Sequence, residues 1–387
     1  MRIVIANHQT AQRYQISSLR TGGSHGGNLT FVLIKRVSLV PPRFVVLGYG
    51  NIGQRHAHLL HHMPEAELVA IIEPDSRNQA AVRELGLYPV FDSLETFLDQ
   101  GPKADIISVC TPNGWHYTHA SQALAGGLHT LVEKPLALTA EACFALVDQA
   151  QASGLCLFGV LQNRYSPPAQ WLKTVIQENR LGQLFMVSVN CLWNRGPQYY
   201  QQCAWRGTAS LDGGPLYTQF SHFIDILPWV FGELHVQDGQ FYDFSHQYIT
   251  DFEDSGIVSM SLSSGAPVNL TYSTAVYPQN MESSITVLGA CGSLKIGGQY
   301  MDQLIHCRIE DYEAPTMPAT NPPNQYGPFQ GSAANHYQVL SNVIKALDGH
   351  SYDVASGAEA AQSIRLIEQA YQIRQTKGIQ QLNASGP

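Results

Sequence analysis

The stretch "RFVVLGYGNIGQRH", residues 43–56, decides the fold of the chain. Its apolar start is typical of a buried strand, and it continues into Gly48, Gly50 and Gly53 with the spacing G-x-G-x-x-G; a helical segment begins at Asn51. In a dinucleotide-binding turn, the first glycine makes the tight turn, the second lets the backbone approach a pyrophosphate, and the third lets helix and strand pack closely. The alternative is a fortuitous glycine-rich turn, but the flanking strand and helix favour the dinucleotide interpretation.

Short apolar runs alternate with helical stretches as far as residue 160. We predict strands at 43–48, 67–73, 105–112, 128–133 and 155–160, with helices at 51–63, 76–85, 94–99, 115–125 and 139–153 between them. Continuous apolar strands that alternate with helices indicate a parallel sheet covered on both faces. Residues 42–161 are therefore predicted to form a Rossmann NAD-binding domain.

The pattern changes after Val160, where a helix at 168–179 precedes strands that are apolar on one side only. Phe185, Val187, Val189 and Trp193 share one face of 184–193; Val268, Leu270 and Tyr272 share one face of 267–273; 284–296 reads as a hairpin around Gly289 and Gly292. One-sided strands imply a mainly antiparallel, open-faced sheet with helices on one face and the other free for a partner. We assign residues 162–387 to a substrate-binding and oligomerisation α/β domain, and expect a homodimer or homotetramer.

Two segments of the chain stand outside this regular pattern. Residues 313–332 are rich in Pro and Gly and read as a long loop. Residues 1–41 contain five basic residues and no acidic one, so we expect a flexible extension; a targeting segment is the alternative.

Composition excludes several classes of function. The chain has 387 residues and a net charge of −8, which argues against a nucleic-acid partner held through its phosphates. We find no apolar run near the roughly 18–20 residues of a membrane span. Seven scattered cysteines without a C-x-x-C pair are typical of a cytoplasmic protein, and we expect neither a disulfide framework nor a bound metal.

Polar residues follow several of the predicted strands. Ligands of open parallel sheets bind at these carboxyl ends of the strands. Glu73 ends the second strand, 20 residues after Gly53, and is placed to accept from ribose hydroxyls. Its charge would repel a 2′-phosphate and favours NAD over NADP, although Arg77 could offset this. The full set of expected cofactor contacts is Gly48, Gly50, Asn51, Ile52, Gly53, Glu73, Thr111, Pro112, Asn113, His116, Glu133, Lys134 and Gln162. His116 could instead cap a helix or lie on the surface.

The segment "TLVEKPLAL", residues 130–138, places Glu133 and Lys134 at the end of a strand. We expect Lys134 to point toward the nicotinamide and the substrate, with Glu133 holding its ammonium by a charge-assisted hydrogen bond. Pro135 restricts Lys134 to an extended backbone. A solvated loop is the plain alternative.

Four segments resemble the Gfo/Idh/MocA oxidoreductase family: "GYGNIGQRH", "CTPNGWHYTHA", "EKPLA" and "DGGPLYTQFSHFIDILPW". The resemblance extends from about residue 44 to 380 and implies catalytic roles for Lys134 and for His222, which is followed by Asp225. Much of the family has Asp or Asn four residues before this histidine. Here that residue is Thr218, which weakens any claim that a carboxylate or amide at this place assists catalysis.

"LQNRYSPPAQ", "WNRGPQYYQQCAWRGT" and "GSAANHYQV" resemble a branch described as UDP-N-acetyl-2-amino-2-deoxyglucuronate dehydrogenases, which oxidise the sugar 3-hydroxyl. That substrate is implied by the resemblance alone. The alternatives are another polyol, such as an inositol or a hexose, and a non-catalytic sugar-nucleotide sensor of the same fold. Retention of Lys134 and His222 argues against the sensor.

Oxidation of a hydroxyl requires a general base, and either Lys134 or His222 could serve. Arg164 and Arg206 are candidates for binding a carboxylate or phosphate, with a structural ion pair as the alternative. We expect Gln162 and Asn163 to bridge cofactor and substrate. The expected substrate contacts are Lys134, Asn163, Arg164, Arg206, Thr218, His222 and Asp225.

Overall fold

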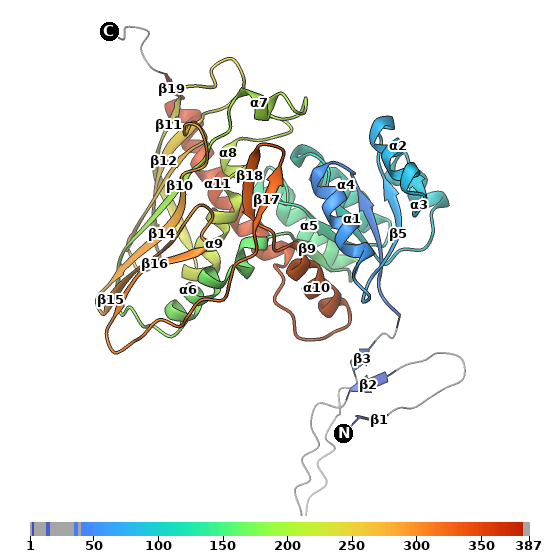
Figure 1. The fold of residues 1–387 in the computed structure, drawn as a ribbon, viewed down its shortest axis with the longest axis horizontal. Helices are drawn as coiled ribbons and strands as arrows, with labels where there is room; N and C mark the ends of the chain where they lie inside the picture. Colours follow the sequence, from blue (N-terminus) through green and yellow to red (C-terminus); the bar gives the residue numbers. More distant parts are fainter. Residues whose placement is uncertain (1, 4–12, 16–34, 38–39, 382–387) are drawn as a thin grey trace, which may run out of the picture.

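The computed structural model describes residues 2–3, 13–15, 35–37 and 40–381. The prediction of a flexible extension at 1–41 falls mostly on residues outside this set. Within that segment the structure describes three short antiparallel strands, β1 (Arg2–Ile3), β2 (Arg13–Gln15) and β3 (Lys35–Val37). The remainder forms two α/β units that lie side by side (Figure 1).

The first unit is a parallel sheet of six strands in the order β6-β5-β4-β7-β8-β9. The strands are β4 (Arg43–Leu47), β5 (Glu67–Ile72), β6 (Val90–Phe91), β7 (Ile106–Val109), β8 (His129–Val132) and β9 (Leu157–Gly159). The helices are α1 (Asn51–His61), α2 (Ser76–Leu85), α3 (Leu94–Gln100), α4 (His116–Ala125) and α5 (Ala140–Ala152), with a 3₁₀ turn η1 (Asn113–Trp115). The predicted Rossmann arrangement is confirmed, and the strand order reverses between β4 and β7, where such sheets bind ligands.

The second unit is built on eight strands in the order β16-β15-β14-β10-β13-β12-β11-β19, and only the pairs β10–β13 and β11–β19 are parallel. The strands are β10 (Leu184–Leu192), β11 (Leu234–Asp243), β12 (Ser255–Leu262), β13 (Pro267–Ser273), β14 (Glu282–Gly289), β15 (Gly292–Gly297), β16 (Gln303–Ile309) and β19 (Gln380–Gln381). The helical segments are η2 (Gln162–Tyr165), α6 (Pro167–Gln177), α7 (Pro197–Tyr200), α8 (Pro215–Thr218), α9 (Ser221–Phe231), α10 (His336–Leu347) and α11 (Gly357–Lys377). In Figure 1, α6, α9 and α11 lie on the side of the sheet that faces the Rossmann unit, as the one-sided strands predicted.

Two details of the second unit differ from the sequence prediction. Phe185 was expected to face the core with Val187, but it lies at the start of β10 beside a register shift and is 54% exposed. The Pro/Gly-rich segment 313–332 is not loop throughout, because β17 (Pro323–Tyr326) and β18 (Phe329–Ala333) pair as an antiparallel hairpin. Backbone pairing of a short hairpin needs no apolar alternation, so the sequence pattern did not show it.

Helix α10 belongs to the second unit in sequence but packs against the Rossmann sheet. Its apolar stripe shares one buried cluster with β4 and α1; the members include Val339, Leu340, Val343, Ile344, Phe44, Val46 and Leu60. The apolar stripe of α10 therefore completes one apolar face of the first unit.

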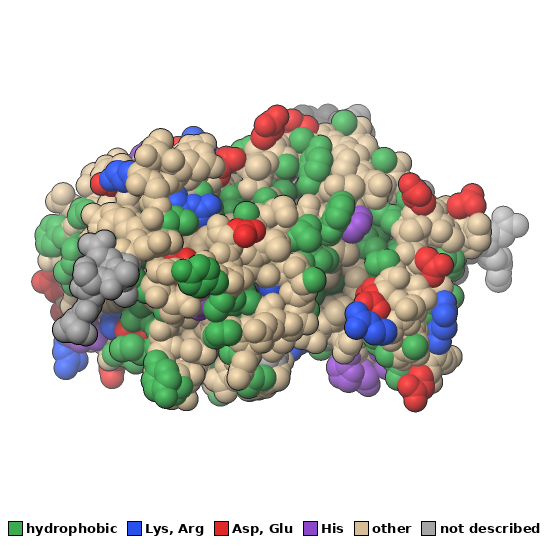
Figure 2. Space-filling view, turned by 90° about the horizontal axis from the view of Figure 1, so that it is seen from above, with side chains coloured by type: hydrophobic (Ala, Val, Ile, Leu, Met, Phe, Trp, Pro, Cys, Tyr) green, Lys and Arg blue, Asp and Glu red, His purple; other side chains and the backbone are tan. Residues whose placement is uncertain are grey.

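Charged residues make up only 13% of the chain. Figure 2 shows Lys, Arg, Asp and Glu scattered over one face, without a continuous basic patch. Across residues 40–381 and the three short strands before them, no helix combines the length and apolarity that crossing a membrane would need.

Candidate active site

A cleft of about 960 Å³ lies where the carboxyl ends of the Rossmann strands meet the second unit. Of the residues predicted from sequence, its lining includes Gly48, Gly50, Asn51, Ile52, Glu73, Thr111, Pro112, Asn113, His116, Glu133, Lys134, Gln162, Arg206, Thr218 and His222. Gly53, Asn163, Arg164 and Asp225 do not line it. Two groups of residues that were predicted separately, one from each unit, are thus brought to a single cavity.

The glycine turn has the geometry that a bound pyrophosphate requires. Gly48 has φ of +91°, which favours glycine, and a Cβ on Gly53 would lie 1.8 Å from the Gly48 carbonyl oxygen. A Cβ on Gly50 would meet no atom within 4 Å and would project into the cleft. Gly50 is the N-cap of α1 and offers no side-chain cap, so the first backbone N–H groups of the helix remain available to an anion. The residues present therefore fit a dinucleotide.

Glu73 is held at the end of β5 by the backbone. Its Oε2 accepts from the Tyr49 N–H at 2.6 Å and its Oε1 from the Asp75 N–H at 2.8 Å, and the residue is 5% exposed. Each carboxylate oxygen retains a lone pair for a ribose hydroxyl. Arg77, which could have offset this charge, is exposed and forms a fork with Asp75 at 2.7 and 3.1 Å.

A buried polar network surrounds the tip of Lys134. Its Nζ donates to the Thr218 carbonyl oxygen at 2.5 Å, and the Asn113 side-chain amide donates to the Thr218 hydroxyl oxygen at 2.8 Å. The Thr218 hydroxyl donates in turn to the carboxylate of Asp212, which is 0% exposed and whose pKa burial raises. A carboxylate therefore does lie in this region, but it comes from the "DGG" segment. Sequence reasoning missed Asp212 because its distance from His222 differs from the family pattern.

Burial lowers the pKa of both Lys134 and His222, but the charges around the two side chains differ. Burial lowers the pKa of Lys134, while Glu133 and Asp212 act in the opposite direction. Burial and the nearby Lys134 charge lower the pKa of His222 well below its usual value, so the imidazole is neutral at pH 7. His222 is 5% exposed, and its Nδ1 has no hydrogen-bond partner among the described residues.

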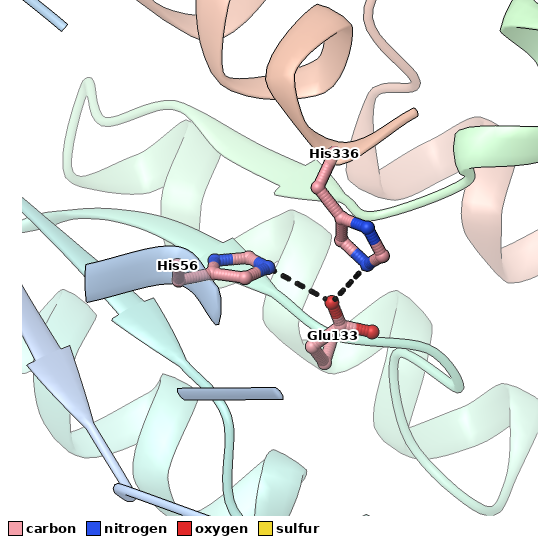
Figure 3. A group of neighbouring side chains, drawn as sticks. All are labelled: His56, Glu133 and His336. Atoms are coloured by element: carbon pink, nitrogen blue, oxygen red, sulfur yellow. Dashed lines mark hydrogen bonds and ion pairs between the residues drawn. The ribbon is translucent and has the colours of Figure 1, made fainter. Parts of the chain in front are cut away.

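The structure corrects the role expected for Glu133. Its Oε2 accepts from the backbone N–H of Lys134 at 3.2 Å, whereas the Lys134 ammonium bonds elsewhere. Its Oε1 lies 3.0 Å from His56 Nε2 and 3.4 Å from His336 Nε2, and Figure 3 shows both imidazoles turned toward this oxygen. Burial would raise the pKa of Glu133, but the two histidines hold it well below its usual value. Glu133 thus fixes the backbone at Lys134 and does not hold its side chain.

Among the described residues, one group has side chains of the kinds and spacing that could hold a metal ion: His56, Glu133 and His336. One ligand atom of each lies within 4.8 Å of the others. Both Nε2 atoms, however, approach a single carboxylate oxygen, which is the arrangement of two hydrogen-bond donors around one acceptor. Sequence reasoning gave neither histidine a role, because they lie 77 and 203 residues from Glu133 along the chain.

His116 connects two strand-end loops inside the cleft wall. It is 1% exposed, and its ring nitrogens lie 2.6 Å from the Pro135 carbonyl oxygen and 2.7 Å from that of Thr111. Burial lowers its pKa, so the neutral ring donates to one carbonyl at a time. The surface alternative for His116 is wrong, since the residue is buried.

Arg164 and Asp225 form a buried ion pair away from the cleft lining. Arg164 Nε and Nη2 donate to the Asp225 carboxylate at 2.7 and 2.8 Å, and Nη1 donates to Glu359 at 3.0 Å. The contacts of Arg164 are therefore those of a structural ion pair, which the sequence analysis gave as the alternative to anion binding. Asn163 is buried nearby, and Gln162 bonds to Asn335 and Ser332 of the second unit.

Two guanidinium groups line the cleft from the second unit. Arg206 lies 4.2 Å from the Tyr199 ring centroid and donates to the Tyr199 carbonyl oxygen at 3.1 Å. Arg195 is 3% exposed, lies 5.1 Å from the same ring and donates to the Gln330 carbonyl oxygen at 2.9 Å. Sequence reasoning proposed Arg206 and missed Arg195, although "WNR" directly follows the one-sided strand β10.

Comparison with known proteins places these features in a family. The Gfo/Idh/MocA oxidoreductase model for an NAD-binding Rossmann fold matches residues 42–160, and the model for the C-terminal alpha/beta domain of that family matches residues 173–381. The chain is 29% identical over 194 residues to D-glucoside 3-dehydrogenase of Escherichia coli K12, which covers 50% of this chain and 54% of that relative. It is 24% identical to glucose-6-phosphate 3-dehydrogenase of Bacillus subtilis, over 84% of this chain and 95% of the relative.

A solved structure is similar over most of the chain. The WlbA dehydrogenase from Bordetella pertussis, in complex with NADH and UDP-GlcNAcA, has a TM-score of 0.76 and 30% identity, covering 87% of this chain and 97% of that one. The WlbA dehydrogenase from Chromobacterium violaceum has a TM-score of 0.76 and 31% identity.

Proposed function

Because the chain belongs to the Gfo/Idh/MocA family and is a sugar oxidoreductase, we propose that it oxidises the 3-hydroxyl of a UDP-N-acetylamino-sugar uronate with NAD as cofactor. The observation that carries the proposal is the pair Lys134 and His222 in one cleft with the glycine turn and two guanidinium groups. Similarity to two WlbA dehydrogenases in complex with UDP-GlcNAcA supports the substrate class.

We propose that Lys134 is the general base. A base is most effective when its pKa lies near the working pH. Burial moves the pKa of Lys134 down toward that range, whereas it moves the pKa of His222 away from it. His222 then orients the sugar hydroxyl through an unpaired ring nitrogen, while Thr218 holds Lys134 Nζ through its carbonyl oxygen. When bound, the nicotinamide accepts the hydride that leaves the sugar carbon.

We propose that Arg195 and Arg206 bind the negative groups of the substrate. Guanidinium groups suit carboxylate and phosphate, and a uronate joined to a diphosphate carries both. Tyr199 supports both cations through its ring. Glu73 disfavours a 2′-phosphate, because its carboxylate is fixed by two backbone amides and Arg77 is paired with Asp75.

A simpler hexose is the second candidate substrate, since two relatives are named as 3-dehydrogenases of a glucoside and of glucose 6-phosphate. NADH absorbance with UDP-GlcNAcA, a glucoside, glucose 6-phosphate and inositol separates these possibilities. The nucleotide sugar should give the highest kcat/KM by at least about tenfold. A higher kcat/KM for a simple hexose would refute the nucleotide sugar as the substrate. The proposal for the general base would still stand.

The Lys134→Met variant tests the base. It should lower kcat by about 100-fold or more, the usual contribution of an acid–base group, and should change the Kd for NAD far less. The double variant with His222→Ala should lose less than the product of the single effects, because the residues act as a unit. Lys173→Met is the matched control, since Lys173 packs on the Trp229 ring and does not line the cleft. Near-normal turnover in Lys134→Met would refute its role as the general base and would indicate a structural role.

We also propose that the chain forms a homodimer or homotetramer through the helix-free face of the eight-stranded sheet. Ile257 and Thr271 are paired across β12 and β13, and Ile257 is 43% exposed between buried neighbours. Ile257→Asp should therefore reduce the mass measured by light scattering. A monomeric wild-type protein would refute this proposal.

A further inference from the structure

His336 is a buried histidine in the cleft wall to which the proposed reaction gives no role. It is the first residue of α10, is 2% exposed and lines the cleft. Its Nε2 faces Glu133, and its Nδ1 has no hydrogen-bond partner within the described part of the chain. A buried acceptor without a partner is costly, so its retention beside a ligand cleft calls for an explanation.

The surrounding charges fix the tautomer of His336. Burial lowers its pKa to about 4, so the ring is neutral at pH 7 and has one N–H and one lone pair. Glu133 can only accept, because its pKa is held well below the usual value; the N–H is therefore on Nε2 and the lone pair on Nδ1. Burial would also lower the pKa of His56, but Cys110 and Glu133 outweigh it and raise that pKa to about 10, so His56 reinforces the charge on Glu133.

His336 is also held rigidly in place. The preceding residue, Asn335, donates its backbone N–H to Gln162 Oε1 at 3.0 Å and its side-chain amide to the Gln162 carbonyl oxygen at 3.2 Å. Gln162 Nε2 donates to Ser332 Oγ at 3.1 Å. These bonds join the β18–α10 connection to the end of the Rossmann sheet, so Nδ1 is pre-oriented before any ligand binds.

The position of His336 along the cleft indicates which ligand group it meets. The glycine turn and Glu73 serve the pyrophosphate and the adenosine ribose, on the β4 and β5 side of the switch point. Glu133 directly follows β8, on the opposite side of the switch point, so its partner His336 lies toward the nicotinamide half. That half carries carboxamide N–H and ribose O–H donors, and both are complementary to a ring nitrogen that can only accept.

We propose that His336 is a cofactor-binding residue whose Nδ1 accepts a hydrogen bond from the nicotinamide half of the cofactor, with Glu133 holding the tautomer this requires. The inference rests on the nicotinamide cofactor of the proposed function and not on its sugar. The competing explanation is that His336 only ties α10 to the end of β8.

Two substitutions at one position separate these explanations. His336→Gln keeps a donor near the position of Nε2 and loses the acceptor at Nδ1, whereas His336→Asn keeps an acceptor near Nδ1 and loses the donor to Glu133. A binding role predicts that Gln weakens the Kd for NAD by about tenfold and that Asn retains most of the affinity. A structural tie predicts the reverse order, in both melting temperature and Kd, and would overturn the proposal.

His56→Gln is the matched control, because it makes the same substitution at the other histidine partner of Glu133, in a residue that does not line the cleft. Its Kd for NAD should stay within about threefold of the wild-type value. NAD in which 3-acetylpyridine replaces nicotinamide lacks the carboxamide N–H. If the donor is the carboxamide, His336→Gln should bind this analogue as well as the wild type does; if it is the ribose, the tenfold loss should persist.

A measurement on the unsubstituted protein covers the case in which a variant does not fold. With ¹⁵N-labelled histidine, the Nδ1 resonance of His336 should move on addition of NAD in the direction of an accepted hydrogen bond. An unchanged resonance under saturating NAD would refute the inference. Failure of the wild-type protein to bind any nicotinamide nucleotide would instead refute the proposed function.

Discussion

The buried pair of Arg164 and Asp225 allows a quantitative test of whether these residues support the fold or bind substrate. The side chains are 7% and 1% exposed and meet through two hydrogen bonds at 2.7 and 2.8 Å. Removing one partner of such a pair leaves an uncompensated buried charge and costs about 3–5 kcal/mol. We therefore expect Arg164→Met and Asp225→Asn each to lower the free energy of unfolding by that amount.

The double variant sharpens this test. Because both single changes break the same bonds, the losses should overlap, and the double variant should be at least about 2 kcal/mol more stable than their sum. Glu359→Gln is the control: this second partner of Arg164 is half exposed, so its loss should cost under about 1 kcal/mol. The free energies come from urea unfolding followed by tryptophan fluorescence.

Enzyme kinetics on the same variants decide between the two roles. If the pair is structural, the folded Asp225→Asn protein should keep a KM for the sugar within about threefold of the wild-type value. A loss of stability below about 1 kcal/mol, together with a KM raised more than about tenfold, would show that Arg164 contacts a substrate anion after all.

Three further predictions concern the cofactor site and acid stability. Glu73→Gln should narrow the preference for NAD over NADP by about tenfold in Kd, and equal use of NADP by the wild-type enzyme would refute the role of this charge. Gly50→Val should weaken NAD binding by at least about tenfold in fluorescence titrations, because its side chain would fill the open space above the turn, while the melting temperature stays nearly constant. The pKa of His336 is about 4 in the folded chain and about 6.5 in the unfolded one, so the unfolded state takes up the extra proton as pH falls below 6.5. This histidine should therefore lower the free energy of unfolding by about 2 kcal/mol between pH 7 and pH 5. In urea titrations, the free energy of unfolding of His336→Gln should fall by about that much less than that of the wild type over the same pH range.

The parts of the site that could be predicted from sequence are those fixed by local geometry. Gly48 and Gly53 adopt conformations or contacts that exclude a side chain, and Glu73 and Lys134 follow strands whose ends must meet at one edge of a parallel sheet. In each case, a short segment is sufficient to position the residue. The same reasoning predicted the parallel sheet of the first unit and the one-sided strands of the second.

The parts that could not be predicted depend on pairings between distant segments. An arginine in "LQNRY" has the same chemistry whether it meets a phosphate or Asp225, and only the packing of η2 against α9 decides between them. The partners of Glu133 are likewise set by the way α10 returns to the first unit. Asp212 has no local signal beyond two following glycines, because its importance arises from the Thr218 hydroxyl that reaches it.

The return of α10 to the Rossmann sheet also bears on how the chain folds during synthesis. The apolar face that Phe44 and Leu60 present is completed by Leu340 and Val343, which are translated about 180 residues after the last Rossmann strand. At roughly 5–20 residues per second, the nascent first unit would expose this face for about 10–40 s. During that interval the exposed apolar face favours aggregation, and a message truncated before α10 would yield a product prone to aggregation and proteolysis.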